Sequence, residues 1–174
     1  MQTINWIIIE KGIFLDKKIR IGCASGFWGD TDIAAPQIIE KGNVDYLVCD
    51  YLSEVTMSIL ARAKLKNDEN GYTKDFINHV GPLLKTIKQN KIKVISNAGG
   101  VNLDACKKAL SNEAKKENIN LKIITVEGDD LSGIQKDLHK MSIKEIDSGK
   151  TLPENILSLN AYLGAPGIKR ALDQ

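Results

Sequence analysis

The sequence predicts an α/β domain with an open, mostly parallel sheet and helices on both faces, a Rossmann-like arrangement of three layers. Short apolar runs rich in β-branched residues recur along the chain, a glycine-rich or acidic loop follows each run, and amphipathic stretches at helical spacing lie between them. Runs that are apolar throughout suit strands covered on both faces of a parallel sheet. The alternation of such strands with helices is typical of right-handed α/β crossovers.

The strands are predicted from the apolar runs, and their inward residues should form the core. A weaker run near Ile156–Asn160 is a candidate fifth strand. The four clearer strands are Ile19–Cys23, Tyr46–Cys49, Lys93–Ser96 and Leu121–Val126. The residues expected to be buried on them are Ile21, Cys23, Leu47, Cys49, Val94, Ile95, Ile123 and Ile124.

The helices are predicted between these runs. Asp32 is the expected N-cap of the first, and Pro36 falls in its first turn, where a missing N–H leaves no hydrogen bond unmade. The predicted helices are Ile33–Lys41, Ser53–Lys66, Thr73–Asn90 with a break near Gly81-Pro82, Leu103–Asn118 and a terminal candidate, Ile168–Asp173.

The length of 174 residues fits one domain with its own core. Residues 1–18 are interpreted as an N-terminal extension, either an added strand or an arm, since the Trp6–Ile9 run is too short to span a bilayer. Residues 19–174 form the predicted α/β domain. A helix at the end of such a domain should feed another strand, so the domain is expected to be incomplete.

Composition excludes several classes of function. The 24 basic and 22 acidic residues are spread along the chain and form no basic tract, which argues against nucleic-acid binding. No apolar run is long enough to span a membrane. The three cysteines match no metal or disulfide spacing, which favours reduced thiols and a cytoplasmic location.

Ligands bind beyond the carboxyl ends of strands in open parallel sheets. Four loops are expected there, at residues 25–30, 50–54, 97–100 and 127–130, and they carry acids, amides and glycines but no lysine, arginine or histidine. Carboxylates are the candidate general acids and bases, with Tyr51 or Tyr162 as hydroxyl donors. The candidate catalytic residues are Asp30, Asp50 and Glu54. The candidate ligand-binding residues are Ser25, Gly26, Phe27, Trp28, Gly29, Asn97, Gly99, Gly100, Asn160 and Tyr162.

Three features of these loops allow two interpretations each. Glu127, Asp129 and Asp130 could bind a divalent cation such as Mg²⁺ through oxygen ligands, or they could simply favour nearby helix starts. Phe27 and Trp28 could form an apolar wall over a ligand or pack against a neighbouring loop or subunit. The segment 97–100 could offer N–H groups to an anion or permit a tight turn.

The loops in order resemble the N-terminal part of the acyclic terpene utilisation (AtuA-like) family, from about Ile19 to Leu172. Phe27-Trp28-Gly29-Asp30 and Asn97-Ala98-Gly99-Gly100 are the most distinctive matching segments. Members of that family are typically longer, so the resemblance implies a truncated or split member. It also implies a role in the breakdown of citronellol-type and geraniol-type terpenes, whose intermediates are carried as coenzyme A thioesters.

Two hypotheses follow for function. The first is a cytoplasmic enzyme, or a fragment of one, that acts on a small carbonyl or acyl metabolite such as a CoA thioester. The second is a noncatalytic module for ligand binding or assembly. The incomplete sheet predicts self-association into a homo-oligomer or pairing with a separate C-terminal half. Leu159, Tyr162, Leu163 and Ile168 are expected near that contact surface.

Overall fold

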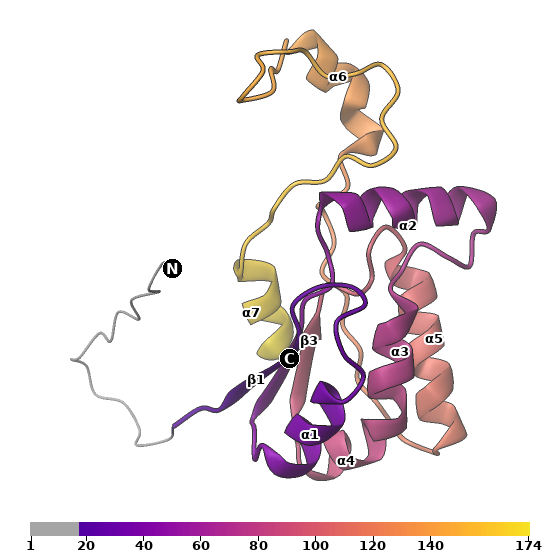
Figure 1. Ribbon diagram of the computed structural model, residues 1–174, viewed down its shortest axis with the longest axis vertical. Helices are drawn as coiled ribbons and strands as arrows, with labels where there is room; N and C mark the ends of the chain where they lie inside the picture. Colours follow the sequence, from indigo (N-terminus) through magenta and orange to yellow (C-terminus); the bar gives the residue numbers. More distant parts are fainter. Residues whose placement is uncertain (1–17) are drawn as a thin grey trace.

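The computed structural model describes residues 18–174 (Figure 1). The predicted N-terminal extension lies outside these residues except for its last one. The strands are β1 (Ile21–Ser25), β2 (Tyr46–Cys49) and β3 (Lys93–Ser96). The helices are α1 (Ala34–Lys41), α2 (Glu54–Lys66), α3 (Lys74–Val80), α4 (Leu84–Gln89), α5 (Leu103–Lys116), α6 (Gln135–Lys140) and α7 (Pro166–Leu172), with short 3-10 helices η1 (Gly81–Leu83) and η2 (Ser132–Ile134).

The three strands form one open parallel sheet in the order β1-β2-β3. The register aligns Leu47 on the central strand with Gly22 on one side and Val94 on the other. The α/β class and the parallel open sheet are therefore confirmed. The predicted break at Gly81-Pro82 is also confirmed, because η1 separates α3 from α4 there.

Helices lie on both faces of the sheet. Helices α1, α3, α4 and α5 form one layer over the face of Leu47, and a Cβ added to Gly22 would lie 2.5 Å from Ile38 of α1. Figure 1 shows α7 on the opposite side of β3 from α3 and α5. There the Lys93 Nζ donates to the Leu172 carbonyl at 2.6 Å. In the described part of the chain, the second face thus carries one short helix.

Two predicted strands are wrong. Leu121–Val126 follows an irregular path with no ladder to β3. Near Ile156–Asn160 the only pairing among the described residues is an isolated antiparallel bridge between Asp130 and Asn160. β-branched residues favour an extended backbone, but a strand also needs a neighbour that shares its hydrogen bonds.

The predicted core is partly correct. Leu47 and Cys49 are buried at 0% and 1% exposure, and Val94, Ile95 and Ile123 are half-buried. Three residues are exposed against prediction: Ile21, Cys23 and Ile124. Ile21 and Cys23 lie on the edge strand β1, on the face of the sheet that α7 covers only in part. Ile124 lies outside the strands.

The N-cap of α1 also differs from the prediction. The helix begins at Ala34 with Ile33 as its N-cap residue, so Asp32 lies one position too early. The Thr31 hydroxyl accepts the Ile33 N–H at 3.3 Å instead.

Residues 132–158 project away from the sheet, with α6 at their far end (Figure 1). Two backbone hydrogen bonds close the base of this appendage, from Leu131 N to Leu159 O and from Ala161 N to Asp129 O, each at 2.8 Å. Within residues 18–174 no helix combines the length and apolar character needed to cross a membrane.

Candidate functional site

The three strands end together at one edge of the sheet, since Ser25, Cys49 and Ser96 lie in register there. The loops that follow them occupy residues 25–30, 50–54 and 97–100. We call these three segments the rim. The structure therefore brings together three of the four loops predicted to meet.

Ser25 joins the first two loops of the rim. Its buried hydroxyl shares its one proton between the Phe27 carbonyl at 2.8 Å and the Asp50 carbonyl at 3.2 Å. The Asp50 N–H in turn donates to the Ser25 carbonyl at 2.9 Å. Both the side chain and the backbone of Ser25 are therefore used to hold the rim.

Asn97 joins the second and third loops. Its Nδ2 donates to Asp50 Oδ1 at 2.7 Å, and its Oδ1 accepts the Tyr51 N–H at 2.9 Å. The Asp50 side chain is exposed, so Asn97 orients a carboxylate that solvent can reach. This pair is the closest contact between predicted site residues from different loops.

The first loop closes on itself, because Asp30 Oδ2 accepts the Gly26 N–H at 3.0 Å. Gly29 has φ +85°, a conformation that favours glycine. The two aromatic side chains of this loop differ in exposure. Trp28 packs against the core cluster, whereas Phe27 is 59% exposed at the rim. Trp28 is thus held in part by packing, and Phe27 is the more exposed of the two rings.

Tyr162 lies beside the start of α2. Its hydroxyl donates to Glu54 Oε1 at 3.3 Å, although the residue is 94% exposed. Asn160, two residues earlier, donates from Nδ2 to Asp129 Oδ2 at 2.9 Å. Asn160 therefore fixes the base of the appendage, and Tyr162 connects that base to the rim.

The predicted metal ligands are engaged locally. Glu127 Oε1 accepts from the Thr125 hydroxyl at 2.9 Å, and Asp130 Oδ1 accepts the Ser132 N–H at 2.9 Å. Hydrogen bonds from Ser132 lower the pKa of Asp130. In the part of the chain that the structure describes, no three acidic, histidine or cysteine side chains are grouped to hold a metal ion. Metal binding here stays a prediction.

The segment 97–100 forms a tight turn. Gly100 has φ +53°, and a Cβ there would lie 2.6 Å from the Gly71 carbonyl oxygen. Its N–H donates to the Asn97 carbonyl at 3.1 Å, and the Asn102 N–H donates to the Gly99 carbonyl at 2.9 Å. Asn102 also caps α5 by accepting the Ala105 N–H at 3.3 Å. These contacts favour the turn over an anion site.

Two polar residues at this edge were not predicted. The Ser96 hydroxyl donates to the Cys49 carbonyl at 2.7 Å and accepts the Ala98 N–H at 3.1 Å. Thr73 is fully buried beside the turn, where its N–H donates to the Ala98 carbonyl at 2.8 Å. Its hydroxyl has no hydrogen-bond partner among residues 18–174. The position of Ser96 at the end of a predicted strand was the signal available for it.

Tyr51 belongs to the core. It is buried, and its ring meets that of Phe76 edge to face with centroids 6.3 Å apart. Burial, together with the nearby Cys49 thiol, raises the pKa of Tyr51 above its ordinary value. The phenol is therefore protonated and directed inward, so the predicted hydroxyl donor that remains at the surface is Tyr162.

Two buried thiols give a pH dependence to stability. Burial raises the pKa of Cys49 and of Cys106 from 9.0 to about 11. Unfolding exposes both, so the unfolded chain ionises first, and the free energy of unfolding should fall as pH rises from 9 towards 11. Urea unfolding at pH 8 and 10.5 measures this loss. The Cys106→Ala variant should lose less stability between these pH values than the wild type. An equal loss would mean that ionisation of the Cys106 thiol does not contribute to the pH dependence.

Comparison with protein families gives one result. The model described as "Acyclic terpene utilisation family protein AtuA" matches residues 19–174. The comparisons with curated proteins and with solved structures give no match. The matched range spans the whole sheet and the rim. The chain therefore belongs to the acyclic terpene utilisation family AtuA.

Proposed function

We propose that this chain binds a small carbonyl or acyl metabolite at the rim and acts on it with the rim carboxylates. The observation that carries the proposal is the hydrogen-bonded link between Asn97 and Asp50, which holds an exposed carboxylate in place between loops from two parallel strands. Preorganised polar groups at the carboxyl edge of such a sheet are typical of ligand sites.

The roles follow from what each side chain can reach. Asp50 acts as the general base, since its carboxylate is exposed and oriented by Asn97. The Tyr162 hydroxyl, which reaches Glu54 Oε1 at 3.3 Å, turns from this carboxylate to donate its one hydrogen bond to the substrate oxygen. Phe27 supplies apolar surface for the substrate's hydrocarbon part.

The family name supports an acyclic terpenoid group as the hydrocarbon part. We infer that it is presented as a coenzyme A thioester, because a thioester carbonyl acidifies the protons on the carbon beside it, and a carboxylate base such as Asp50 can then remove one of them. The cysteines form no disulfide, which supports a cytoplasmic setting for this reaction.

A second candidate is a noncatalytic binding module. Two observations favour it. Asp30, Asp50 and Asn97 all take part in hydrogen bonds that hold the rim. Two surface hollows, of about 300 and 670 Å³, lie elsewhere, one beside α5 at Tyr72 and Lys108 and one on the appendage at His139. A module of this kind would bind the same ligands but would not convert them to a product.

Calorimetry and product analysis with acyclic acyl-CoA thioesters, with and without Mg²⁺, separate the candidates. We expect wild-type protein to bind and turn over one of them. The Asp50→Asn variant should bind it and lose about 100-fold or more in rate. The matched control is Asp137→Asn on α6, whose carboxylate pairs with Lys140 in the appendage, and it should behave as wild type. If the wild type binds a thioester but forms no product, the chain is the noncatalytic binding module. If no thioester binds, both candidate functions are contradicted.

A further inference from the structure

β1 is an open edge of the sheet in residues 18–174. It has β2 on one side and no strand on the other. The Tyr46 N–H donates to the Arg20 carbonyl at 3.1 Å, so Arg20 and Gly22 direct their backbone groups towards β2. Because backbone direction alternates along a strand, Ile21 and Cys23 direct theirs outwards. An edge of this kind can pair with another strand.

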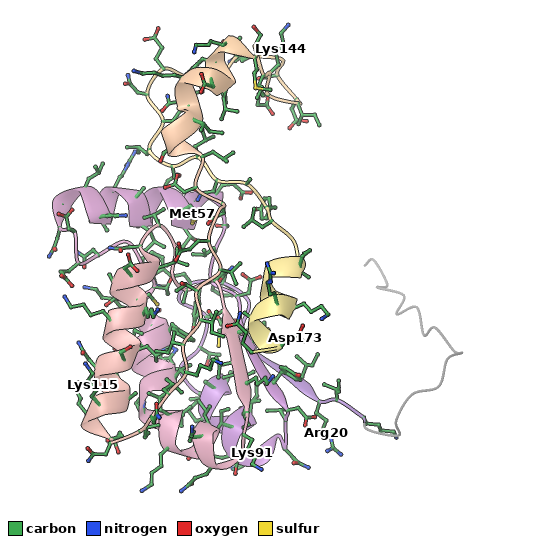
Figure 2. The ribbon with its side chains drawn as sticks, turned by 180° about the vertical axis from the view of Figure 1, so that it is seen from behind. Arg20, Met57, Lys91, Lys115, Lys144 and Asp173 are labelled. Carbon is green, nitrogen blue, oxygen red and sulfur yellow. The ribbon has the colours of Figure 1, made fainter. Side chains whose placement is uncertain are left out.

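The side chains along this edge are apolar and accessible. Ile19 is 60% exposed, Ile21 is 68% exposed, and Cys23 is exposed. Figure 2 places Arg20 at the outer margin of the molecule, away from the helical layer. The register between β1 and β2 shifts between Cys23 and Ser25, so the regular part of the edge ends at Cys23.

Charge differs between the two ends of this edge. Lys18 and Arg20 lie at its start, together with Asp45, whose carboxylate accepts the Arg20 N–H at 2.9 Å, so this end carries a net positive charge; the loop after its other end carries Asp30 and Asp32. An antiparallel pair of β1 strands related by a two-fold axis at Gly22 would set the basic start of each copy beside the acidic loop of the other. A parallel pair would set like charges together. The edge is therefore complementary to itself in the antiparallel sense.

We propose that β1 pairs antiparallel with β1 of a second copy of this chain about a two-fold axis at Gly22. Ile21 then lies opposite the partner's Cys23, and the loop that follows β1 lies towards the start of the partner's β1 strand, where Lys18 and Arg20 lie. The dimer thus brings a cation to the rim, whose own loops contain no lysine, arginine or histidine. The dimer does not rest on the ligand proposed above.

Light scattering after size-exclusion chromatography tests the dimer. The full chain should have twice its chain mass of 19.2 kDa. The Ile21→Lys variant should raise the dissociation constant by about tenfold or more, because it sets a charge in the paired strands. Leu65→Lys is the matched control, since Leu65 is 76% exposed on α2, and it should remain dimeric.

Crosslinking tests the same pairing without a destabilised variant. Cys23 is exposed, whereas Cys49 and Cys106 are buried. In the proposed register, Cys23 and the partner's Cys23 are diagonal neighbours, about 7–8 Å apart. A short bismaleimide should therefore link two wild-type chains, and Cys23→Ser should abolish the link. A monomeric wild type overturns the proposal, as does a dimer that Cys23 cannot link. A monomer whose Cys23 resists alkylation also overturns it and means that the edge is covered within the chain.

Discussion

Replacing Leu47 with alanine is expected to lower the free energy of unfolding by about 2–5 kcal/mol. Leu47 has 0% exposure and lies on the central strand, between Gly22 and Val94. The helical layer packs over it, so the lost side chain leaves a cavity that neighbouring strands cannot easily fill. Urea unfolding followed by circular dichroism measures the change.

Ile123→Ala provides the comparison for this test. Ile123 is half-buried on an irregular segment that pairs with no strand, so its truncation should cost clearly less than that of Leu47. Equal losses for the two variants would mean that Ile123 is packed as tightly as Leu47, contrary to the structure.

Replacing Asn97 with alanine should destabilise the chain by about 1–3 kcal/mol and abolish ligand binding at the rim. The change removes the donor to Asp50 and the acceptor for the N–H of buried Tyr51. A buried N–H without a partner carries a desolvation cost, and Asp50 loses the group that orients it. Urea unfolding and calorimetry with the thioester bound by the wild type measure the two effects.

Asn112→Ala is the matched control for Asn97. Asn112 is exposed on α5, and alanine is the better helix former, so stability and binding should be unchanged or stability slightly raised. If Asn97→Ala binds ligand as tightly as this control, then the link between the loops is structural and has no part in binding.

The sequence could predict the sheet where local signals agreed. Each of the three correct strands is followed by a loop and then a helix, and their parallel order places the following loops at one edge. Leu121–Val126 has the same β-branched character but no ladder, because strand formation depends on a neighbour that lies far away in sequence. The exposure of Ile21 and Cys23 depends likewise on how much of the second face is covered, which no local pattern reports.

The candidate site was predictable to the level of loops. The division of polar groups between holding the rim and facing a ligand was not predictable, because it depends on contacts between residues distant in sequence. Asn97 and Asp50, for example, are joined across 47 positions. Phe27 and Trp28 are adjacent and similar in chemistry, yet only the three-dimensional structure separates the exposed ring from the packed one.

The central claim is that a small acyl or carbonyl ligand binds at the rim. Backbone amide NMR spectra of the full chain, recorded during titration with the thioester that binds, test it most directly. The account predicts that the largest shift changes fall on residues 25–30, 50–54 and 97–100, with little change in the appendage at 132–158. Changes concentrated on the appendage, or around Tyr72 and Lys108 beside α5, with the rim unaffected, would contradict it.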